Sequence, residues 1–224
     1  MKKILTLLTA GFLCIVRPCS GQSLEARADF MSRYMLRGYS LSEGKVIQPS
    51  ITAGYEGVTL VGFTNYDTNP KKINEIDLSS DYTTSIADNV NVSVGINVNT
   101  FPLAQDSAPR QINEAYGAIS LTNILNPKIM VLKSWGDVKG TIAELSINPT
   151  VDIGGQDIST TLLLGYDKNY FNPDAGLSHA EIKLSTIIPI TDNVSIIPML
   201  NYTRRLAEGF NNELYGEIGV SVKY

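Results

Sequence analysis

The sequence predicts an all-β protein, a closed antiparallel transmembrane β-barrel of about 12 strands. Apolar and polar residues alternate with a period of two along most of residues 22–224, and the connections between these segments alternate between short and long. The chain also ends on such a segment, which closes with an aromatic residue, Tyr224. A period of two gives a strand two chemically different faces, as a barrel with lipid outside and a polar lumen requires.

Residues 1–21 have the features of a secretory signal peptide and are excluded from the expected barrel, which spans residues 22–224. Lys2 and Lys3 give a basic start, and the apolar run that follows, residues 4–16, is too short to span a bilayer. Ser20 and Gly21 are small residues suited to cleavage. Export of the chain is therefore expected.

A mature chain that begins at Gln22 contains no cysteine, because Cys14 and Cys19 both precede it. Its 15 basic residues, the 18 of the whole chain less Lys2, Lys3 and Arg17, stand against 22 acidic ones, a net charge of −7. This balance argues against a nucleic-acid partner.

The strands are expected in order along the chain, each with one apolar and one polar face. The first, residues 24–38, alternates apolar residues such as Leu24 and Phe30 with charged ones such as Arg27 and Asp29. Pro198 interrupts a later strand and predicts a bulge there. The remaining segments are residues 47–55, 58–66, 75–86, 90–98, 113–121, 129–135, 140–148, 157–166, 179–190, 194–205 and 214–224.

The connections predict the orientation of the barrel. Those at residues 56–57, 87–89, 122–127, 150–156 and 191–193 are short, and those at 39–46, 67–74, 100–112 and 167–178 are longer and polar. Outer-membrane barrels have short turns on the periplasmic side and long loops outside. Aromatic residues near the ends of the outward faces then form two girdles at the membrane interfaces: Tyr34, Tyr66, Trp135, Tyr166 and Tyr202 at the upper one, Tyr55, Tyr82 and Tyr224 at the lower one.

The inward faces carry the candidate functional residues, which are charged. Rings of charged side chains select ions in pores, whereas opposed arginine and carboxylate groups can equally fill a lumen as a structural plug. Both interpretations remain open; if the lumen conducts, Arg27, Arg33 and Arg37 along the first strand favour anions. The pore-lining candidates are Arg27, Asp29, Arg33, Arg37, Glu75, Asp77, Asp81, Glu114, Glu144, Asp157, Glu181, Lys183, Arg205 and Glu217.

The last strand carries an expected assembly signal on its apolar face, formed by Val220, Val222 and Tyr224. A terminal strand that ends in an aromatic residue resembles the signal by which bacterial outer-membrane barrels are handed to their insertion machinery. The expected partners are therefore outer-membrane lipid and the barrel-assembly machinery, with ions or a small solute in the lumen.

Enzymatic chemistry is not expected. The only histidine, His179, is expected to be an inward residue at the barrel rim, without the positioned partner that a general base requires. No cluster has metal-ligand spacing and no glycine-rich phosphate loop is present, so no cofactor is expected. A soluble β-sandwich would keep the alternation but does not account for the girdles.

Several short motifs resemble the TorF-like porins, a family of small outer-membrane proteins. The first hairpin has an S-x-Y-x-x-R-G-x-S pattern from Ser32 to Ser40, followed by Gln48-Pro49-Ser50. Later similarities are residues 75–78, Phe101-Pro102, 114–116 and 125–127. The resemblance implies a closed barrel and a pore in the bacterial outer membrane with no established cargo. The alternative is a non-conducting structural or adhesion barrel that acts through its extracellular loops.

Overall fold

The computed structural model describes residues 22–69, 71–104 and 108–224, so the expected signal peptide lies outside the described residues. Those residues contain no helix that is long and apolar enough to cross a membrane. The strands are β1 (Gln22–Met31), β2 (Met35–Leu36), β3 (Tyr39–Ser40), β4 (Val46–Tyr55), β5 (Val58–Asp67), β6 (Lys72–Ala87), β7 (Val90–Thr100), β8 (Gln111–Leu121), β9 (Lys128–Gly136), β10 (Thr141–Ile147), β11 (Thr150–Ile153), β12 (Gln156–Lys168), β13 (Gly176–Thr186), β14 (Ile188–Pro189), β15 (Val194–Arg205) and β16 (Glu213–Lys223).

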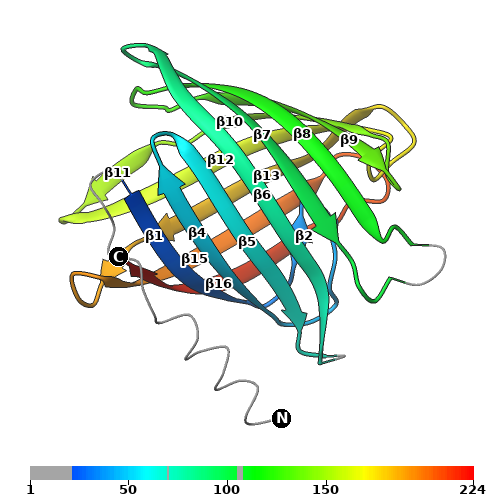
Figure 1. Ribbon diagram of the computed structural model, residues 1–224, viewed down its shortest axis with the longest axis horizontal. Helices are drawn as coiled ribbons and strands as arrows, with labels where there is room; N and C mark the ends of the chain where they lie inside the picture. Colours follow the sequence, from blue (N-terminus) through cyan, green and yellow to red (C-terminus); the bar gives the residue numbers. More distant parts are fainter. Residues whose placement is uncertain (1–21, 70, 105–107) are drawn as a thin grey trace.

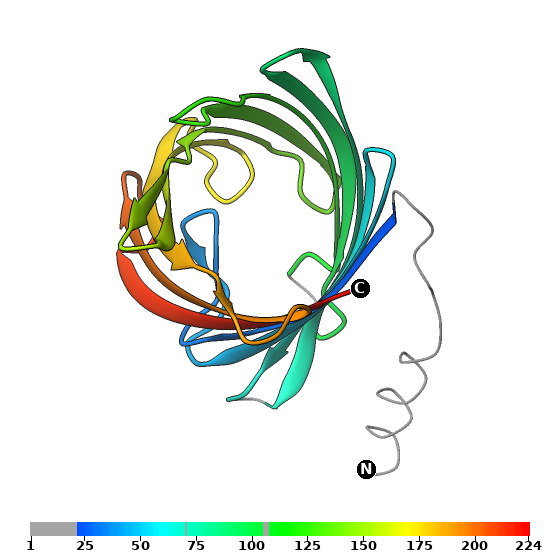
Figure 2. The ribbon, with the colours of Figure 1, turned by 90° about the vertical axis from the view of Figure 1, so that its left-hand side faces the viewer.

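The strands close into a barrel of 12 antiparallel strands, as the alternation predicts. Each main strand pairs with its neighbour in the chain, and β1 pairs with β16 to form the closing seam (Figures 1 and 2). The seam extends beyond β16, because the Tyr224 amide donates to the Leu24 carbonyl at 2.9 Å. A closed barrel leaves no unpaired edge, which is a condition for crossing a membrane with strands.

The short strands β11 and β14 are continuations of longer ones. β10 and β11 both pair with β12 in a single register, interrupted only at Asn148 and Pro149. The expected short connection at residues 150–156 is therefore mostly strand, and the turn of this hairpin is Gly154-Gly155, both with positive φ. Such φ values are available to glycine at little cost.

Pro198 causes no bulge, contrary to the expectation from sequence. The pairing of β15 with β16 runs without a shift through Pro198 and its partner Ile218. On the other side of β15, β13 ends at Thr186 and β14 begins at Ile188 in the same register, so the ladder is interrupted opposite the proline. A proline lacks the N–H that the ladder needs. The chain accommodates it by a local loss of pairing with no extra residue.

The outer face of the barrel is apolar. Leu78, Val94, Ile129 and Leu214 are each at least half exposed, although each lies on a strand of the closed sheet. Many of the residues that alternate with them, such as Ser93 and Ser134, are polar and turn inward. Ile112, Leu132 and Ile142 instead form an apolar cluster on the inner face. A large exposed apolar belt on a closed barrel is the surface that lipid covers.

The first strand is shorter than predicted, and this overturns one girdle position. β1 ends at Met31, and residues 32–45 turn into the barrel, where Tyr34 is only 7% exposed in a cluster with Met31, Met35, Val46 and Tyr215. Tyr34 is therefore not an interfacial residue. The alternation of apolar and charged residues continues past β1 because it belongs to an internal hairpin, β2–β3, which has two chemically different faces of its own.

Candidate constriction of the barrel lumen

The β2–β3 hairpin reaches across the lumen. Its strands pair Met35 with Ser40 and Leu36 with Tyr39, which leaves Arg37 and Gly38 as a two-residue turn. Both have positive φ, 50° for Arg37 and 80° for Gly38, the pattern of a type I′ turn. In Figure 2 the segment that contains this hairpin, drawn in blue, lies inside the ring of strands. The turn thus presents an arginine side chain at the tip of a short, rigid hairpin.

Glycine is required at position 38 because the hairpin turn lies directly against the barrel wall. A Cβ atom at Gly38 would lie 2.5 Å from the Cβ and Cγ atoms of His179 on β13. His179 itself is 2% exposed and packs on its other side against Gly165 of β12. The histidine is inward, as predicted, but it lies beneath the hairpin and not at an open rim. Any side chain at position 38 would push the hairpin tip away from the wall.

Arg37 binds two acidic residues on the opposite wall. Its Nη1 lies 2.9 Å from Oε1 of Glu114 on β8, and its Nη2 donates to Oε2 at 3.3 Å. Its Nε lies 3.8 Å from Oε1 of Glu144 on β10. The two-point contact with Glu114 fixes both the position and the plane of the guanidinium. The hairpin is therefore attached to the far wall by a charge-assisted pair.

Glu114 has no spare hydrogen-bonding capacity on either oxygen. The Tyr170 hydroxyl donates to Oε1, and the Asn97 side-chain amide donates to Oε2 at 2.9 Å. The Arg37 guanidinium also lies over the Tyr170 ring, 5.3 Å from its centroid. Its 1% exposed side chain makes Glu114 the most enclosed partner in this group.

The Arg37 guanidinium stays ionised because the Glu114 carboxylate lies against it. Burial alone would lower the pKa of the Arg37 guanidinium, but the charge of Glu114 and its hydrogen bonds outweigh burial and raise that pKa above its ordinary value. Burial also raises the pKa of the Tyr170 hydroxyl, which therefore remains a hydrogen-bond donor. The constriction stays charged and hydrogen-bonded across the ordinary pH range.

Three loops meet around the hairpin through an aromatic cluster formed by Tyr39, Tyr170, Phe171 and Phe210. Tyr39 and Phe171 stack with centroids 4.8 Å apart, and Phe171 lies edge-on to Tyr170 at 4.7 Å and to Phe210 at 6.3 Å. These residues come from the connections β1–β4, β12–β13 and β15–β16. Residues from loops far apart in the sequence therefore pack together in the loop half of the lumen.

Hydrogen bonds of backbone and asparagine side-chain groups also tie the same loops to one another. The Asn211 amide donates to the Gly38 carbonyl at 3.0 Å, and the Ser40 amide donates to the Asn211 side chain at 3.1 Å. The Asn172 side chain donates to the Glu208 carbonyl at 2.9 Å. The loops are thus fixed to one another as well as to the wall.

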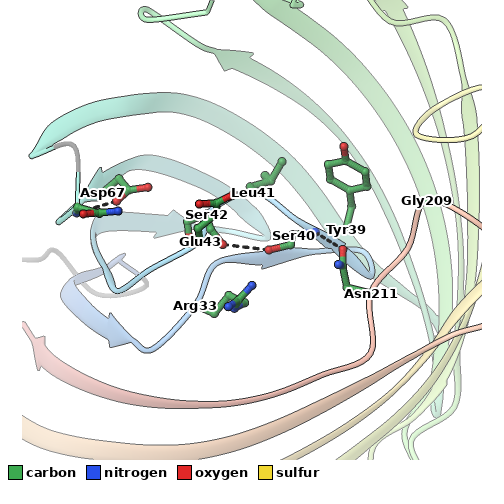
Figure 3. Close-up of a pocket in the computed structure, with 10 residues that line it drawn as sticks. Arg33, Tyr39, Ser40, Leu41, Ser42, Glu43, Asp67, Gly209 and Asn211 are labelled. Carbon is green, nitrogen blue, oxygen red and sulfur yellow. Dashed lines mark hydrogen bonds between the residues drawn. The ribbon is translucent and has the colours of Figure 1, made fainter.

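A cavity of about 540 Å³ lies on the loop side of the hairpin. Figure 3 shows Arg33, Tyr39 and Asn211 around it, with Asp67 at the end of β5 on its far side. Arg33 does not lie on a strand of the wall, and its Nη1 is 3.2 Å from Oε1 of Glu213. The cavity is lined by charged groups of both signs and by polar groups.

Glu75, Asp77 and Asp81 make the inner face of β6 acidic. None of these three carboxylates forms an ion pair with a residue that the structure describes. Glu75 and Asp77 line a cavity of about 200 Å³ beneath the hairpin, together with Asn97, Asn99 and Glu114. One oxygen of Asp77 is buried there without a hydrogen-bond partner. The carboxylates along this wall therefore have no cationic partner among the described residues.

Arg27, Arg33 and Arg37 do not lie along one strand of the wall, contrary to the prediction from sequence. Arg27 is on β1, where its Nη2 lies 2.7 Å from Asp29 and 3.4 Å from Glu217, whereas Arg33 and Arg37 leave the wall with the internal loop. Each arginine is bound to different carboxylates. Three side chains that alternation alone would align along one wall are separated because β1 ends at Met31.

The other predicted lumenal residues fall into two groups. Glu181 and Lys183 lie on the inner face of β13, paired across from Thr203 and Asn201. Asp157 and Arg205 share the inward parity of their strands but are exposed at opposite ends of the barrel. These two residues lie at the rims and do not contact the constriction.

The remaining predicted girdle residues lie on outward faces. Tyr55, Tyr82, Trp135, Tyr202 and Tyr224 are between 39% and 52% exposed near strand ends. Tyr66 and Tyr166 are half-buried at the loop ends of β5 and β12. Val220 and Val222 share the outward face of β16 with Tyr224, and Val220 pairs with Ala28 at the seam.

Sequence reasoning missed four residues that complete the constriction: Asn97, Tyr170, Phe171 and Phe210. It placed His179 inward but at the rim, not beneath the hairpin. The loop aromatics were visible as apolar residues in otherwise polar connections, and Arg37-Gly38 between alternating residues had the form of a hairpin turn. Nothing in the sequence indicated that these loops would turn inward.

A family model described as a bacterial protein of unknown function (Gcw_chp) matches residues 16–186. No curated protein matches the chain. Among solved structures, the KdgM porin in complex with disordered oligogalacturonate is 11% identical, with a TM-score of 0.57 over 90% of this chain and 98% of that chain. The NanC porin is 12% identical, with a TM-score of 0.55 over 90% and 98%.

LpxR from Salmonella typhimurium is 10% identical, with a TM-score of 0.52 over 89% of this chain and 99% of that chain. At such identities the likeness concerns the fold. The KdgM and NanC porins and LpxR share this barrel fold with the chain.

Proposed function

The chain belongs to the Gcw_chp family of bacterial proteins of unknown function, and we propose that it is a passive pore of the bacterial outer membrane for ions and small polar solutes. The observation that carries this proposal is the contrast between the two faces of the closed barrel. The outer face is apolar, and the inner face carries the charged side chains. A polar lumen inside a lipid-facing wall is the arrangement of a porin. The TorF-like resemblance and the porin neighbours support the same assignment.

The charge of the lumen supports cations as the preferred ions. Arg27, Arg33 and Arg37 are bound to carboxylates, whereas Glu75, Asp77 and Asp81 on β6 have no cationic partner among the described residues. This replaces the anion preference expected from the arginines. It also argues against an acidic oligosaccharide such as the oligogalacturonate in the KdgM complex, since such a ligand would meet uncompensated carboxylates.

The hairpin narrows the pathway in this proposal. Solutes would enter by the polar cavity beside Arg33 and pass the Arg37–Glu114 pair before they reach the acidic wall of β6. Because the hairpin is attached at both its tip and its neighbouring loops, it acts as a fixed constriction, as inward loops and charged rings do in channels.

The second candidate is a non-conducting structural barrel, and the packing of the loops favours it. Tyr170 and Phe210 are buried inside the barrel, where Tyr170 contacts Arg37 and Phe210 contacts Phe171, so side chains occupy part of the lumen at this level. The same packing disfavours adhesion through these aromatics, because they are not available to an outside partner.

Single-channel recording on the purified, refolded protein in a planar bilayer tests the proposal. We expect discrete current steps in potassium chloride and a reversal potential that indicates cation preference in a salt gradient. Absence of current from a preparation that shows heat-modifiable migration on a detergent gel would favour the non-conducting barrel. The outer-membrane lipid and the barrel-assembly machinery are the partners that this location implies.

A further inference from the structure

The outer face of the barrel carries charges of one sign, and only at its loop end. On the described strands, the charged residues that share the parity of the lipid-facing positions are Lys133 of β9, Lys168 of β12 and Arg204 of β15. All three are exposed and lie near the loop ends of their strands. Every acidic residue on a described strand shares the inward parity instead. The basic residues on the lipid-facing surface therefore all lie at the loop end of the barrel.

Lys133 and Lys168 lie at the same level of the barrel, on the two strands that flank β10. Lys133 is directly opposite Thr141 of β10, and Thr141 is directly opposite Lys168. Since neighbouring strands are about 4.8 Å apart, the two lysine Cα atoms are separated by about 10 Å, within the joint reach of both side chains. The Lys133 ammonium donates to the Thr141 hydroxyl at 3.2 Å. Lys133, Thr141 and Lys168 are called the basic patch below.

The lysines of the basic patch lack an acidic partner among the residues that the structure describes. Neither lysine forms an ion pair within the described part of the chain. Lys133 also lies two residues closer to the middle of β9 than the lipid-facing Trp135, which is 47% exposed. A lysine below the aromatic level of a lipid-facing surface is costly unless its ammonium reaches the interface and an anion there.

We propose that the basic patch binds the phosphate-bearing headgroup of a lipid in the outer leaflet. Lys133 and Lys168 flank Thr141 on the two strands beside β10. The Thr141 hydroxyl accepts a hydrogen bond from Lys133 and can donate its own proton to a phosphate oxygen. Apolar side chains on the same face below the patch would contact the acyl chains: Val131, Leu145 and Leu164. This inference rests on the outer-membrane location proposed above but is independent of conduction.

Binding of phosphatidic acid to the folded full-length protein in detergent tests the inference, with phosphatidylcholine of the same acyl chains as the neutral comparison. We expect phosphatidic acid to bind more tightly, and K133Q/K168Q to weaken it by about tenfold. The salt dependence of binding should also be smaller in this variant. K128Q/K223Q removes the same charge from exposed lysines at the opposite end of the barrel and should bind like the wild type. K133R/K168R should retain binding.

Equal binding of phosphatidic acid by the wild type and K133Q/K168Q would overturn the inference, as would equal binding of the two lipids by the wild type. Inorganic phosphate that competes at the same concentration as the lipid would mean a site for a free anion and would also overturn it. The pore is tested separately, because loss of lipid binding with unchanged single-channel currents contradicts only the basic patch. Lipid binding without current contradicts only the pore.

Discussion

Arg37 and Glu114 join the two sides of the barrel through its lumen, by hydrogen bonds of 2.9 and 3.3 Å between residues on an internal hairpin and on β8. The pair is enclosed, since the side chains are 15% and 1% exposed. Removal of one partner from a buried pair leaves the other charge uncompensated. Arg37 therefore fixes the position of the constriction. Movement of the hairpin would require the free energy of separating the Arg37–Glu114 pair.

Replacement of Arg37 by glutamine is expected to widen the pathway. The variant should destabilise the folded barrel by about 3 kcal/mol, because Glu114 is left buried without its cation. It should also raise the single-channel conductance, since the hairpin tip loses its attachment to the far wall. Arg33→Gln is the control, because the Arg33–Glu213 pair is more exposed and lies at the entrance. Unchanged conductance in Arg37→Gln would mean that the pair does not set the constriction.

The loop end of the barrel is expected to face the outside of the cell. A cysteine at the exposed Asp174, in the β12–β13 connection, should react in intact cells with a thiol reagent that cannot cross membranes. A cysteine at the exposed Asp88, in the β6–β7 turn, should react only after lysis. The native cysteines, Cys14 and Cys19, both lie in the expected signal peptide. Labelling of the cysteine at position 88 in intact cells would mean that the β6–β7 turn faces the outside, opposite to the expected topology.

The barrel itself could be predicted from sequence because the period of two depends only on the two solvents that each strand meets. Residues 90–98 of β7 illustrate this, with valines and isoleucine outward and asparagines inward. The constriction could not be predicted in the same way. Residues 32–40 continue the alternation of β1, and only the positive φ values of Arg37 and Gly38 and the contact of Gly38 with His179 separate an internal hairpin from a wall strand. Those features depend on long-range packing.

The assignment of faces predicts different outcomes for adjacent residues of β7. Val94→Arg places a charge on an outward position in the middle of the strand, where it should destabilise the barrel by about 2–4 kcal/mol. Ser93→Arg places the same charge on the inner face, near the carboxylates of β6, and should assemble normally. The folded fraction is measured by heat-modifiable migration of membrane extracts. Equal folded fractions for the two variants would contradict the assigned register.

Tyr224 is expected to be more important for assembly than another tyrosine of similar exposure. Tyr224 and Tyr55 are 52% and 50% exposed on outward faces at the same end of the barrel. If the terminal strand is the signal for insertion, Tyr224→Ser should lower the membrane yield strongly and Tyr55→Ser only slightly. The comparison removes the general effect of losing an interfacial ring. Similar yields from both variants would mean that Tyr224 acts only as a girdle residue.

The acidic wall of β6 predicts the ion preference of the pore. Asp77→Asn with Asp81→Asn removes two inward carboxyl groups that have no cationic partner among the described residues, at nearly constant volume, so the reversal potential in a potassium chloride gradient should shift toward anions. The shift should decrease at high salt, because the Debye length falls from about 10 Å at 0.1 M to about 3 Å at 1 M.

The matched control for this pair is Asp157→Asn with Asp174→Asn, which makes the same change in net charge at exposed positions outside the constriction. That variant should keep the wild-type reversal potential. A shift of equal size in both variants would mean that the overall charge of the protein sets the preference. An unchanged potential in the Asp77 and Asp81 variant would mean that ions do not pass along β6, and that the filter lies at the entrance beside Arg33.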